Sequence, residues 1–265
     1  MRGTARLRLS NAAYSAAHLA LFAWALIACE APVERVSPEV VLTLPHDTSA
    51  YTQGLLFHNR LLWESTGGWG TSTIRQVDPQ TGRVLRVRAL PDHLFGEGLA
   101  LVDSTLVQLT WMAGLAFVYD LDSLEVLRTF RYSGEGWGLC FDGASLYMSN
   151  GSDSLYRRDP RTFAVLEARP VTDEGVPVPL LNELECVGES VWANVYQEDR
   201  VVEIDKATGR VVRELDGYPL RLLNGVANDA GAVLNGIAYG PDADVFFLTG
   251  KLWPKMFVVR IPGPS

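Results

Sequence analysis

The chain has 265 residues with a formal net charge of −8, and 48% of its residues are apolar. This length allows one large domain or two small ones, and the composition excludes a largely disordered chain. An acidic chain lacks the basic face that phosphate backbones require, so we expect no nucleic-acid partner. The 24 Gly and 14 Pro residues lie among short apolar runs and favour an all-β fold with frequent turns.

Residues 1–28 are predicted to be a lipoprotein signal peptide. A basic start with three Arg residues precedes an apolar stretch over 16–28, which is too short to span a bilayer comfortably. The stretch ends in Leu26-Ile27-Ala28-Cys29, which resembles the lipobox of bacterial lipoproteins, so we expect cleavage before Cys29 and lipidation of its side chain. An ordinary secretory signal or an uncleaved anchor is the alternative. The prediction is an exported protein, anchored by lipid in the bacterial cell envelope and facing the periplasm or the cell exterior.

Residues 29–38 are polar with two prolines and are predicted to be a tether, which leaves residues 39–265 for the folded domain. Cys140 and Cys186 remain in that domain. They form a disulfide in an oxidising compartment, or they stay as buried free thiols, and the sequence leaves both readings open.

The predicted domain repeats itself and shows no sustained 3.6-residue apolar period. A polar or aromatic residue, then a small or acidic residue, then Leu or Ile recurs five times, roughly every 45 residues. The copies are Gln53-Gly54-Leu55, Glu97-Gly98-Leu99, Trp137-Gly138-Leu139, Asn182-Glu183-Leu184 and Asn235-Gly236-Ile237.

Each copy opens the same succession of four short strands. Second strands are expected at 61–63 and 190–195, and third strands at 73–77 and 200–204. A turn of the form Asp-x-x-Thr-Gly follows the third strand, because Asp caps the turn and Gly takes the positive φ. The clearest copies of that turn are Asp78-Pro79-Gln80-Thr81-Gly82 and Asp205-Lys206-Ala207-Thr208-Gly209.

Five units of four antiparallel strands predict a five-bladed β-propeller. The fifth unit ends one strand short, at 257–261, and residues 39–44 are expected to supply the missing strand and close the ring. Two stacked sheets or a six-bladed ring are the alternatives. We expect a monomer, because a closed ring leaves few open sheet edges.

The first residue of each copy is expected to face one mouth of the central channel. These residues are Gln53, Glu97, Trp137, Asn182 and Asn235. A second ring is expected at the far end of the next strand, formed by Trp111, Asn150, Tyr196 and Lys251, with Glu64 near the equivalent position. Together they predict a small polar substrate held between aromatic walls, with one carboxylate for proton transfer. Aromatic walls would also desolvate Glu97 and raise its pKa toward neutrality.

Neither a metal site nor a cofactor is predicted. His46, His58 and His93 lack paired ligand spacing, and the sequence contains neither a nucleophile elbow nor a phosphate-binding glycine loop. Calcium held by Glu and Asn at the propeller mouth stays an alternative.

Six ordered segments resemble the glutaminyl-peptide cyclotransferases of the plant and bacterial type. They are Tyr51-Thr52-Gln53-Gly54-Leu55, Trp63-Glu64-Ser65-Thr66-Gly67, Phe95-Gly96-Glu97-Gly98-Leu99, Gly136-Trp137-Gly138-Leu139, Leu181-Asn182-Glu183-Leu184-Glu185 and Thr249-Gly250-Lys251-Leu252-Trp253-Pro254-Lys255. The resemblance covers residues 39–261 and itself implies a five-bladed propeller, in agreement with the repeats.

The resemblance implies an activity and roles for the residues. The α-amine of an N-terminal glutaminyl residue attacks its own side-chain amide carbon, ammonia leaves, and a pyroglutamyl terminus results, without a metal. By resemblance Glu97 is the general acid and base, while Gln53, Asn182 and Lys251 hold and polarise the substrate amide. The remaining candidates bind substrate: Trp111, Trp137, Tyr196, Tyr51, Glu64 and Asn235.

Two positions depart from the family pattern. Tyr51 stands where Phe is usual, and Tyr196 stands where a third pocket Trp is expected. Both keep an aromatic face and add a hydroxyl, so we expect retained activity with a changed affinity for the residue after Gln. The competing interpretations are a non-catalytic ligand-binding propeller and a calcium-dependent hydrolase of the lactonase kind. The expected partners are N-terminal glutaminyl peptides or proteins, with membrane contact only through the lipid anchor.

Overall fold

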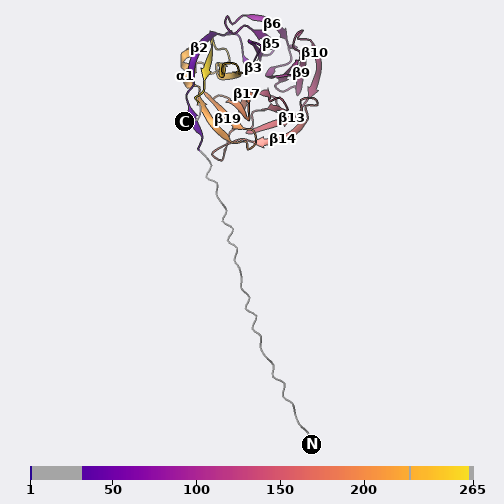
Figure 1. The fold of residues 1–265 in the computed structure, drawn as a ribbon. Helices are drawn as coiled ribbons and strands as arrows, with labels where there is room; N and C mark the ends of the chain where they lie inside the picture. The colour runs from indigo at the N-terminus through magenta and orange to yellow at the C-terminus, as the bar shows by residue number, and fades with distance from the viewer. Residues whose placement is uncertain (2–31, 227, 263–265) are drawn as a thin grey trace. The chain divides into compact units, whose positions relative to one another are not determined.

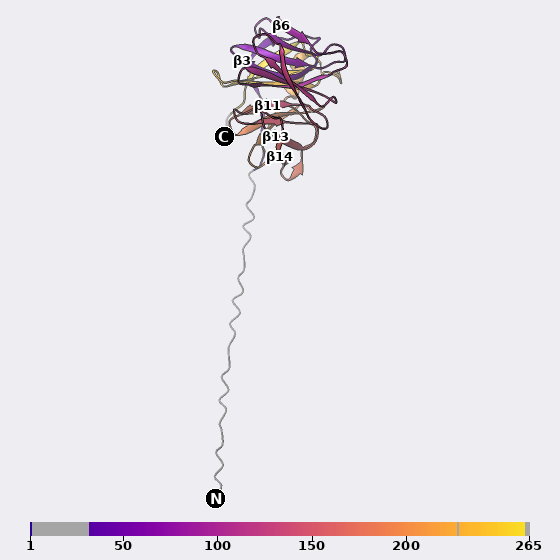
Figure 2. The same ribbon diagram turned by 90° about the vertical axis from the view of Figure 1, so that its right-hand side faces the viewer.

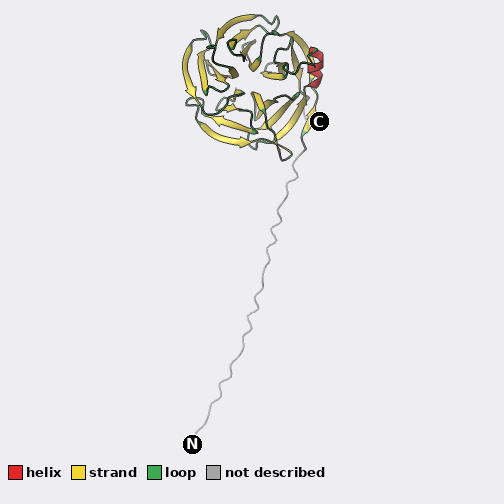
Figure 3. Cartoon of the chain, turned by 180° about the vertical axis from the view of Figure 1, so that it is seen from behind, coloured by secondary structure: helices red, strands yellow, loops and turns green. Residues whose placement is uncertain are grey.

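A computed structural model describes Met1, residues 32–226 and residues 228–262. Except for Met1, the predicted signal peptide therefore lies outside the described part of the chain, and so does Cys29. Residues 32–226 and 228–262 form one compact unit, in which five mainly antiparallel sheets are arranged as a ring (Figure 3). The predicted five-bladed β-propeller is confirmed. Within the described residues, no helix is long and apolar enough to cross a membrane.

Each blade is one sheet that runs from an inner strand at the centre to an outer strand at the rim, as the labels of β3 and β6 show (Figure 1). Blade 1 contains β3 (Thr52–His58), β4 (Leu61–Thr66), β5 (Thr73–Val77) and β6 (Val84–Ala89). Blade 2 contains β7 (Gly96–Val102), β8 (Thr105–Thr110), β9 (Leu115–Asp120) and β10 (Val126–Arg131). Blade 3 contains β11 (Leu139–Phe141), β12 (Leu146–Met148), β13 (Ser154–Arg158) and β14 (Val165–Pro170).

The last two blades are less regular. Blade 4 contains β17 (Leu181–Val187), β18 (Ser190–Val195), β19 (Arg200–Asp205) and β20 (Val211–Asp216). Blade 5 contains β21 (Leu234–Gly240), β22 (Val245–Gly250), β23 (Lys255–Arg260) and β2 (Glu39–Pro45). A hairpin of β15 (Thr172–Asp173) and β16 (Val176–Pro177) connects blade 3 to blade 4 along the chain. The short helix α1 (Tyr218–Asn224) follows blade 4.

The N-terminal strand closes the ring as predicted, because β2 pairs antiparallel with β23 and completes blade 5. A further strand lies inside the segment predicted as a tether. Residues Glu34–Val36 form β1, which pairs in parallel with β20 and adds a fifth strand to blade 4. This pairing covers the outer edge of β20, which would otherwise present unpaired backbone groups. The sheet structure therefore begins before residue 39.

Five hydrophobic clusters fill the gaps between neighbouring blades. Leu62 and Phe247, for example, lie in the cluster shared by blades 1 and 5, and Trp63 and Leu106 lie in the cluster shared by blades 1 and 2. The same arrangement recurs for the other three pairs of blades. Burial between blades is thus the main force that holds the ring together. In the view turned by 90°, the labelled strands of blade 1 (β3, β6) lie above those of blade 3 (β11, β13, β14) (Figure 2).

The predicted turn after the third strand is present in blades 1 to 4, whereas the third strand of blade 5, β23, is the last strand in the described part of the chain. The carboxylate of Asp205 accepts hydrogen bonds from the backbone N–H and hydroxyl of Thr208, and Gly209 has a φ of 75°. In blades 2 and 3 the glycine position holds Leu124 and Phe163, with φ values of 60° and 62°. Both side chains are buried, so core packing offsets the cost of the left-handed backbone there.

The repeat motif coincides with a break in strand register. In the inner strands β3, β7, β17 and β21 the pairing with the second strand shifts at the motif, as between Thr52 and Gly54. Such a bulge re-aims the side chain that precedes it. The bulges explain how Gln53, Glu97 and Asn182 turn toward the mouth of the ring while the rest of each strand packs between blades.

The glycine of the motif is required by the close approach of the inner strands. A Cβ on Gly54 would lie 2.6 Å from the backbone N of Leu99, and a Cβ on Gly98 would lie 2.5 Å from the backbone N of Leu139. Blade 4 alone has a larger residue, Glu183, at this position.

The carboxylate of Glu183 joins three blades at the centre of the ring. It accepts hydrogen bonds from the backbone N–H of Leu55 in blade 1 at 3.1 Å and of Ile237 in blade 5 at 2.8 Å. The side chain is fully buried, and this burial, together with nearby Glu185, raises the pKa of Glu183 well above its usual range. The two N–H donors oppose that shift in part.

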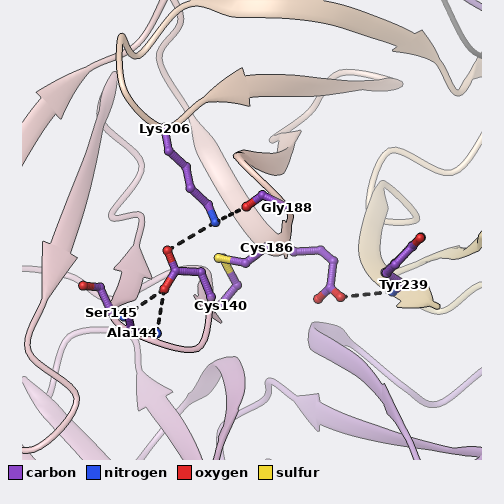
Figure 4. The surroundings of a disulfide bond; sticks show 9 residues. Cys140, Ala144, Ser145, Cys186, Gly188, Lys206 and Tyr239 are labelled. Carbon is purple, nitrogen blue, oxygen red and sulfur yellow. Dashed lines mark hydrogen bonds and ion pairs between the residues drawn. A yellow bond between two sulfur atoms is a disulfide. The ribbon is translucent and has the colours of Figure 1, made fainter.

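A disulfide joins Cys140 on β11 to Cys186 on β17, so the alternative of two free thiols is wrong. The two cysteines are 46 residues apart in sequence, and their disulfide links the inner strands of blades 3 and 4 (Figure 4). Close to it, the ammonium of Lys206 donates to Asp142 at 3.2 Å and to the carbonyl of Gly188 at 2.7 Å.

We expect Glu183→Ala to lower the free energy of unfolding by about 2–4 kcal/mol, because two buried N–H groups lose their acceptor. Glu183→Gln keeps one carbonyl acceptor and should lose less. Urea denaturation measures both variants. Equal losses for the two, or a loss below about 1 kcal/mol for Ala, would show that the central hydrogen bonds contribute little.

Candidate active site

A cavity of about 510 Å³ lies at the end of the ring where the inner strands begin. Its lining residues are Ser49, Tyr51, Gln53, Gly67, Gly68, Trp69, Thr71, Phe95, Glu97, Trp111, Trp137, Asn182, Tyr196, Lys251 and Leu252. Gln53, Glu97 and Asn182 are the second residues of inner strands, and Trp111, Tyr196 and Lys251 directly follow second strands. A second cavity, of about 430 Å³, lies near the disulfide, where Lys206 and Asp142 pair with each other.

The structure brings eight of the ten predicted site residues to this cavity. They are Gln53, Glu97, Asn182, Lys251, Trp111, Trp137, Tyr196 and Tyr51. Asn235 and Glu64 do not line it. Asn150, predicted in the second ring, does not line it either, because its side-chain oxygen accepts a hydrogen bond from the Ser152 hydroxyl at 2.6 Å.

Glu97 lies at the end of a chain of amides. The side-chain nitrogen of Gln53 donates to the Glu97 carboxylate at 2.8 Å, and that of Asn235 donates to Gln53 Oε1 at 3.4 Å. Asn235 also donates to the backbone carbonyl of Thr52 at 2.9 Å, which fixes its own position. Asn235 therefore acts behind the cavity, where it orients Gln53, and Gln53 in turn orients Glu97.

The charged groups at the floor are both buried. Glu97 is 4% exposed and Lys251 is 2% exposed. Burial raises the pKa of Glu97 well above its usual range, the charge of Glu135 adds to this rise, and Lys251 opposes it. Burial also lowers the pKa of Lys251 to about 8, against the attraction of Glu97. Strongly shifted pKa values of buried groups that line a cavity are a feature of functional sites.

The two departures from the family pattern enclose Lys251. Its ammonium nitrogen lies 4.6 Å from the ring centre of Tyr51 and 4.8 Å from that of Tyr196. Both aromatic faces attract the cation. Tyr196 also packs edge-on against Trp137, at 5.5 Å between ring centres. The effect of these tyrosines on substrate affinity stays a prediction.

Asn182 lines the cavity and contains a buried acceptor without a partner. Its side chain is 2% exposed, and its Oδ1 has no hydrogen-bond partner among the described residues. A buried acceptor without a partner costs free energy, so a donor from a ligand would satisfy it.

Glu64 belongs to a different buried cluster, and its predicted role in substrate binding is not supported by its position. Its carboxylate accepts hydrogen bonds from Thr52 at 2.7 Å and Arg75 at 2.8 Å, and it lies 3.1 Å from the ring of His46. Burial opposes its ionisation, but His46 and Arg75 outweigh that effect and hold the pKa of Glu64 at about 2. The second-ring position of blade 1 is held by Gly67, the first residue after β4, because that strand extends beyond Glu64.

Aromatic side chains form one continuous wall of the cavity. Phe95 packs edge-on against Trp111 and Trp69, with ring centres 5.7 and 5.6 Å apart, and against Tyr51 at 6.1 Å. Neither Trp69 nor a role for Phe95 was predicted from the sequence. Nothing in the repeat marks Trp69, because it lies on the loop after β4 rather than at a repeated strand position.

Comparisons with known proteins agree on one family. A family model described as glutamine cyclotransferase matches residues 13–261 of the chain. The chain belongs to the glutamine cyclotransferase family. It is 40% identical over 234 residues to the glutaminyl-peptide cyclotransferase of Arabidopsis thaliana, covering 86% of this chain and 72% of the relative. The crystal structure of the glutaminyl cyclase of Myxococcus xanthus matches with a TM-score of 0.83 and 41% identity, covering 89% of this chain and all of that one.

No group of three or more His, Cys, Asp or Glu side chains in the described part of this cyclotransferase is arranged to hold a metal ion.

Glu135 is a further site residue of the cyclotransferase that the sequence did not reveal. One of its carboxylate oxygens accepts hydrogen bonds from two indole N–H groups, that of Trp111 at 2.7 Å and that of Trp137 at 2.8 Å. The two indoles come from blades 2 and 3, so a single carboxylate fixes the orientation of both walls. The segment that carries it is itself held by a hydrogen bond from Gly136 N–H to the Trp111 carbonyl, at 2.9 Å.

We expect Glu135→Ala to reduce kcat/KM for an N-terminal glutaminyl peptide by about 10–100-fold, because both indoles lose their acceptor. Glu135→Gln keeps an acceptor oxygen and removes the charge, so it should retain most of the activity. The charge of Glu135 helps to raise the pKa of Glu97, so the pH limb that titrates Glu97 should move to lower pH in this variant. Steady-state kinetics over a pH series measures both effects. Equal losses of kcat/KM in the two variants would contradict the positioning role, and an unshifted limb in Glu135→Gln would contradict the effect of the charge.

Proposed function

We propose that this cyclotransferase converts N-terminal glutaminyl residues to pyroglutamyl residues with release of ammonia, and that Glu97 moves the proton. The observation that carries the proposal is the buried Glu97 carboxylate, held by Gln53 at the floor of an aromatic cavity that also contains the buried ammonium of Lys251. The family assignment supports the same activity.

The raised pKa of Glu97 suits it to both halves of the reaction. A carboxylate with an ordinary pKa is too weak a base for an α-ammonium group, whose own pKa is about 8. Burial brings the pKa of Glu97 toward that of the amine, so the carboxylate can take the proton and the resulting acid can release it.

Starting from the neutral α-amine, the reaction balances with one proton carried by Glu97. The α-amine nitrogen forms a bond to the side-chain amide carbon and gives its proton to Glu97. The bond from that carbon to the amide nitrogen then breaks as Glu97 protonates the departing nitrogen, and ammonia leaves. The attack is intramolecular, so the aromatic walls contribute by holding the cyclising conformer.

Negative charge develops on the amide oxygen as the new bond forms, and Lys251 supplies the opposite charge. A cation in a site without water is worth far more than in solution. Asn182 Oδ1 is a free acceptor for an N–H of the substrate amide, which would fix the amide plane. Gln53 acts mainly as a positioning residue through Glu97.

We further propose that the reaction needs no metal ion. Lys251 provides the charge that a Lewis acid would supply to the amide oxygen, and Glu97 provides the base that a metal-bound hydroxide would supply. Both groups belong to the protein itself.

Ammonia release from a Gln-Ala peptide tests the proposal, with and without EDTA. We expect EDTA to change nothing and Glu97→Gln to reduce kcat by about 10²–10⁴-fold, because the amide cannot accept a proton at neutral pH. Glu125→Gln is the matched control, since the Glu125 side chain is 72% exposed. It should behave as the wild-type protein.

Other outcomes would favour the competing interpretations. No turnover of any N-terminal glutaminyl peptide by well-folded protein would favour a binding propeller. Activity that EDTA removes and calcium restores would favour a metal-dependent hydrolase.

The lowered pKa of Lys251 predicts the pH dependence. As the pH rises through about 8, Lys251 loses its proton and its stabilising charge, so its contribution to kcat/KM should decline above that pH. Lys251→Arg keeps a charge over this range and should lose this limb, whatever its absolute activity. The substrate α-amine titrates identically with both enzymes, so the difference between the two profiles isolates Lys251. Parallel profiles would contradict the assignment.

A further inference from the structure

The lip of the cavity is exposed and uncharged, whereas its floor is buried and charged. Trp69 lines the cavity and is 55% exposed, whereas Glu97, Asn182 and Lys251 at the floor are 2–4% exposed. Its neighbours on the exposed part of the lining are the small polar residues Ser49 and Thr71. The charged residues of the lining are Glu97 and Lys251, and both are buried. The exposed residues of the lining therefore carry no charge.

The position of the reacting groups fixes the direction of the bound peptide. On the proposed function, both the α-amine and the side-chain amide of the first residue must reach Glu97 and Lys251 at the floor. The centre of the ring is filled beyond them by the Glu183 carboxylate and its two hydrogen bonds. The carbonyl of the first residue and everything after it must therefore leave through the mouth, which Trp69 borders.

Trp69 is held in place for such a contact. Its ring lies 5.6 Å from Phe95 and 6.5 Å from Trp111, centre to centre, so it extends the aromatic wall outward. Gly68 and Gly70 flank it with φ values of 130° and 74°, which a residue with a side chain rarely adopts.

The loop that carries Trp69 is also tied down by hydrogen bonds. Gly70 N–H donates to the carbonyl of Asp92 at 3.0 Å, and the Ser72 hydroxyl donates to the carbonyl of Gly68 at 2.7 Å. A pre-organised aromatic surface binds an apolar group at a lower entropic cost than a mobile one.

We infer that Trp69 forms a subsite for the side chain of the residue that follows the N-terminal glutamine, and that it favours apolar and aromatic side chains there. An aromatic or aliphatic side chain gains contact area against the exposed indole face. A charged side chain meets no opposite charge on this part of the lining. This inference rests on the proposed function and adds a preference among its substrates.

The test compares two peptide amides that differ only at the second residue, Gln-Phe-amide and Gln-Gly-amide. The wild-type protein should turn over the Phe peptide with the higher kcat/KM. Trp69→Ala should reduce the ratio of the two kcat/KM values about tenfold, mainly through KM for the Phe peptide. Trp69→Phe should keep most of the ratio, because it keeps an aromatic face.

Met112→Ala is the matched control. Met112 follows Trp111, is also 55% exposed, and does not line the cavity. This variant should leave the ratio unchanged. A ratio near one in the wild-type protein, or an unchanged ratio in Trp69→Ala, overturns the subsite.

A binding measurement separates failure of the subsite from failure of the proposed function. Calorimetric titration with pyroglutamyl-Phe-amide and pyroglutamyl-Gly-amide needs no turnover. Tighter binding of the Phe compound by the wild-type protein, with the difference lost in Trp69→Ala, supports the subsite even where turnover fails. Equal binding of the two compounds, together with normal ammonia release, overturns the subsite and leaves the proposed function intact.

Discussion

The close approach of five inner strands at the axis is the constraint on which the rest of the structure depends. Glycine at the repeat motif removes the side chain that would separate neighbouring blades, as the 2.6 Å approach of a Cβ on Gly54 to Leu99 illustrates. The space that remains accepts a single larger residue, Glu183, whose carboxylate satisfies backbone donors of blades 1 and 5. Because the inner strands meet so closely, the residue before each glycine is brought within reach of its equivalents on the other blades.

The site uses this convergence at some cost in free energy. Glu97 and Lys251 are buried deeply enough for their pKa values to move in opposite directions, and Asn182 keeps an acceptor without a partner. Each of these features destabilises the folded protein in isolation. They are tolerated because the interblade clusters and the central hydrogen bonds hold the strands regardless of what the mouth contains. The stability of the strands thus permits a set of buried polar groups that would destabilise a less well-packed protein.

The sequence predicted the features that repeat and missed those that do not. The strands over 73–77 and 190–195 are where the pattern indicated, and the closing strand at Glu39–Pro45 followed from the count of strands in the last unit. Glu64 was misplaced because β4 is longer than its apolar core suggests, so the end of the strand falls at Thr66. Its partner Arg75 is on the adjacent strand, which a reading of single positions does not reveal.

Contacts between segments that share no pattern were beyond reach from the sequence. Glu135 bonds to two indoles from different blades, and Trp69 is on a loop outside the repeat. Strand β1, before the first blade, pairs with β20, the outer strand of blade 4. The family resemblance identified residues at repeated positions, and it could not identify side chains whose role follows from their neighbours in space.

The closure of blade 5 by strands from both ends of the domain has a consequence for how the chain folds. During synthesis β2 is made before the four complete blades, and its partner β23 is made after them. Until that last strand emerges, β2 has no neighbour in its sheet, and blade 5 consists of β21 and β22 alone. The ring therefore completes in a single late step of high contact order, which makes folding slow compared with a chain of local contacts. A chain that stops before Lys255 lacks β23, so the edges of β2 and β22 that pair with β23 stay unpaired, and such edges promote aggregation.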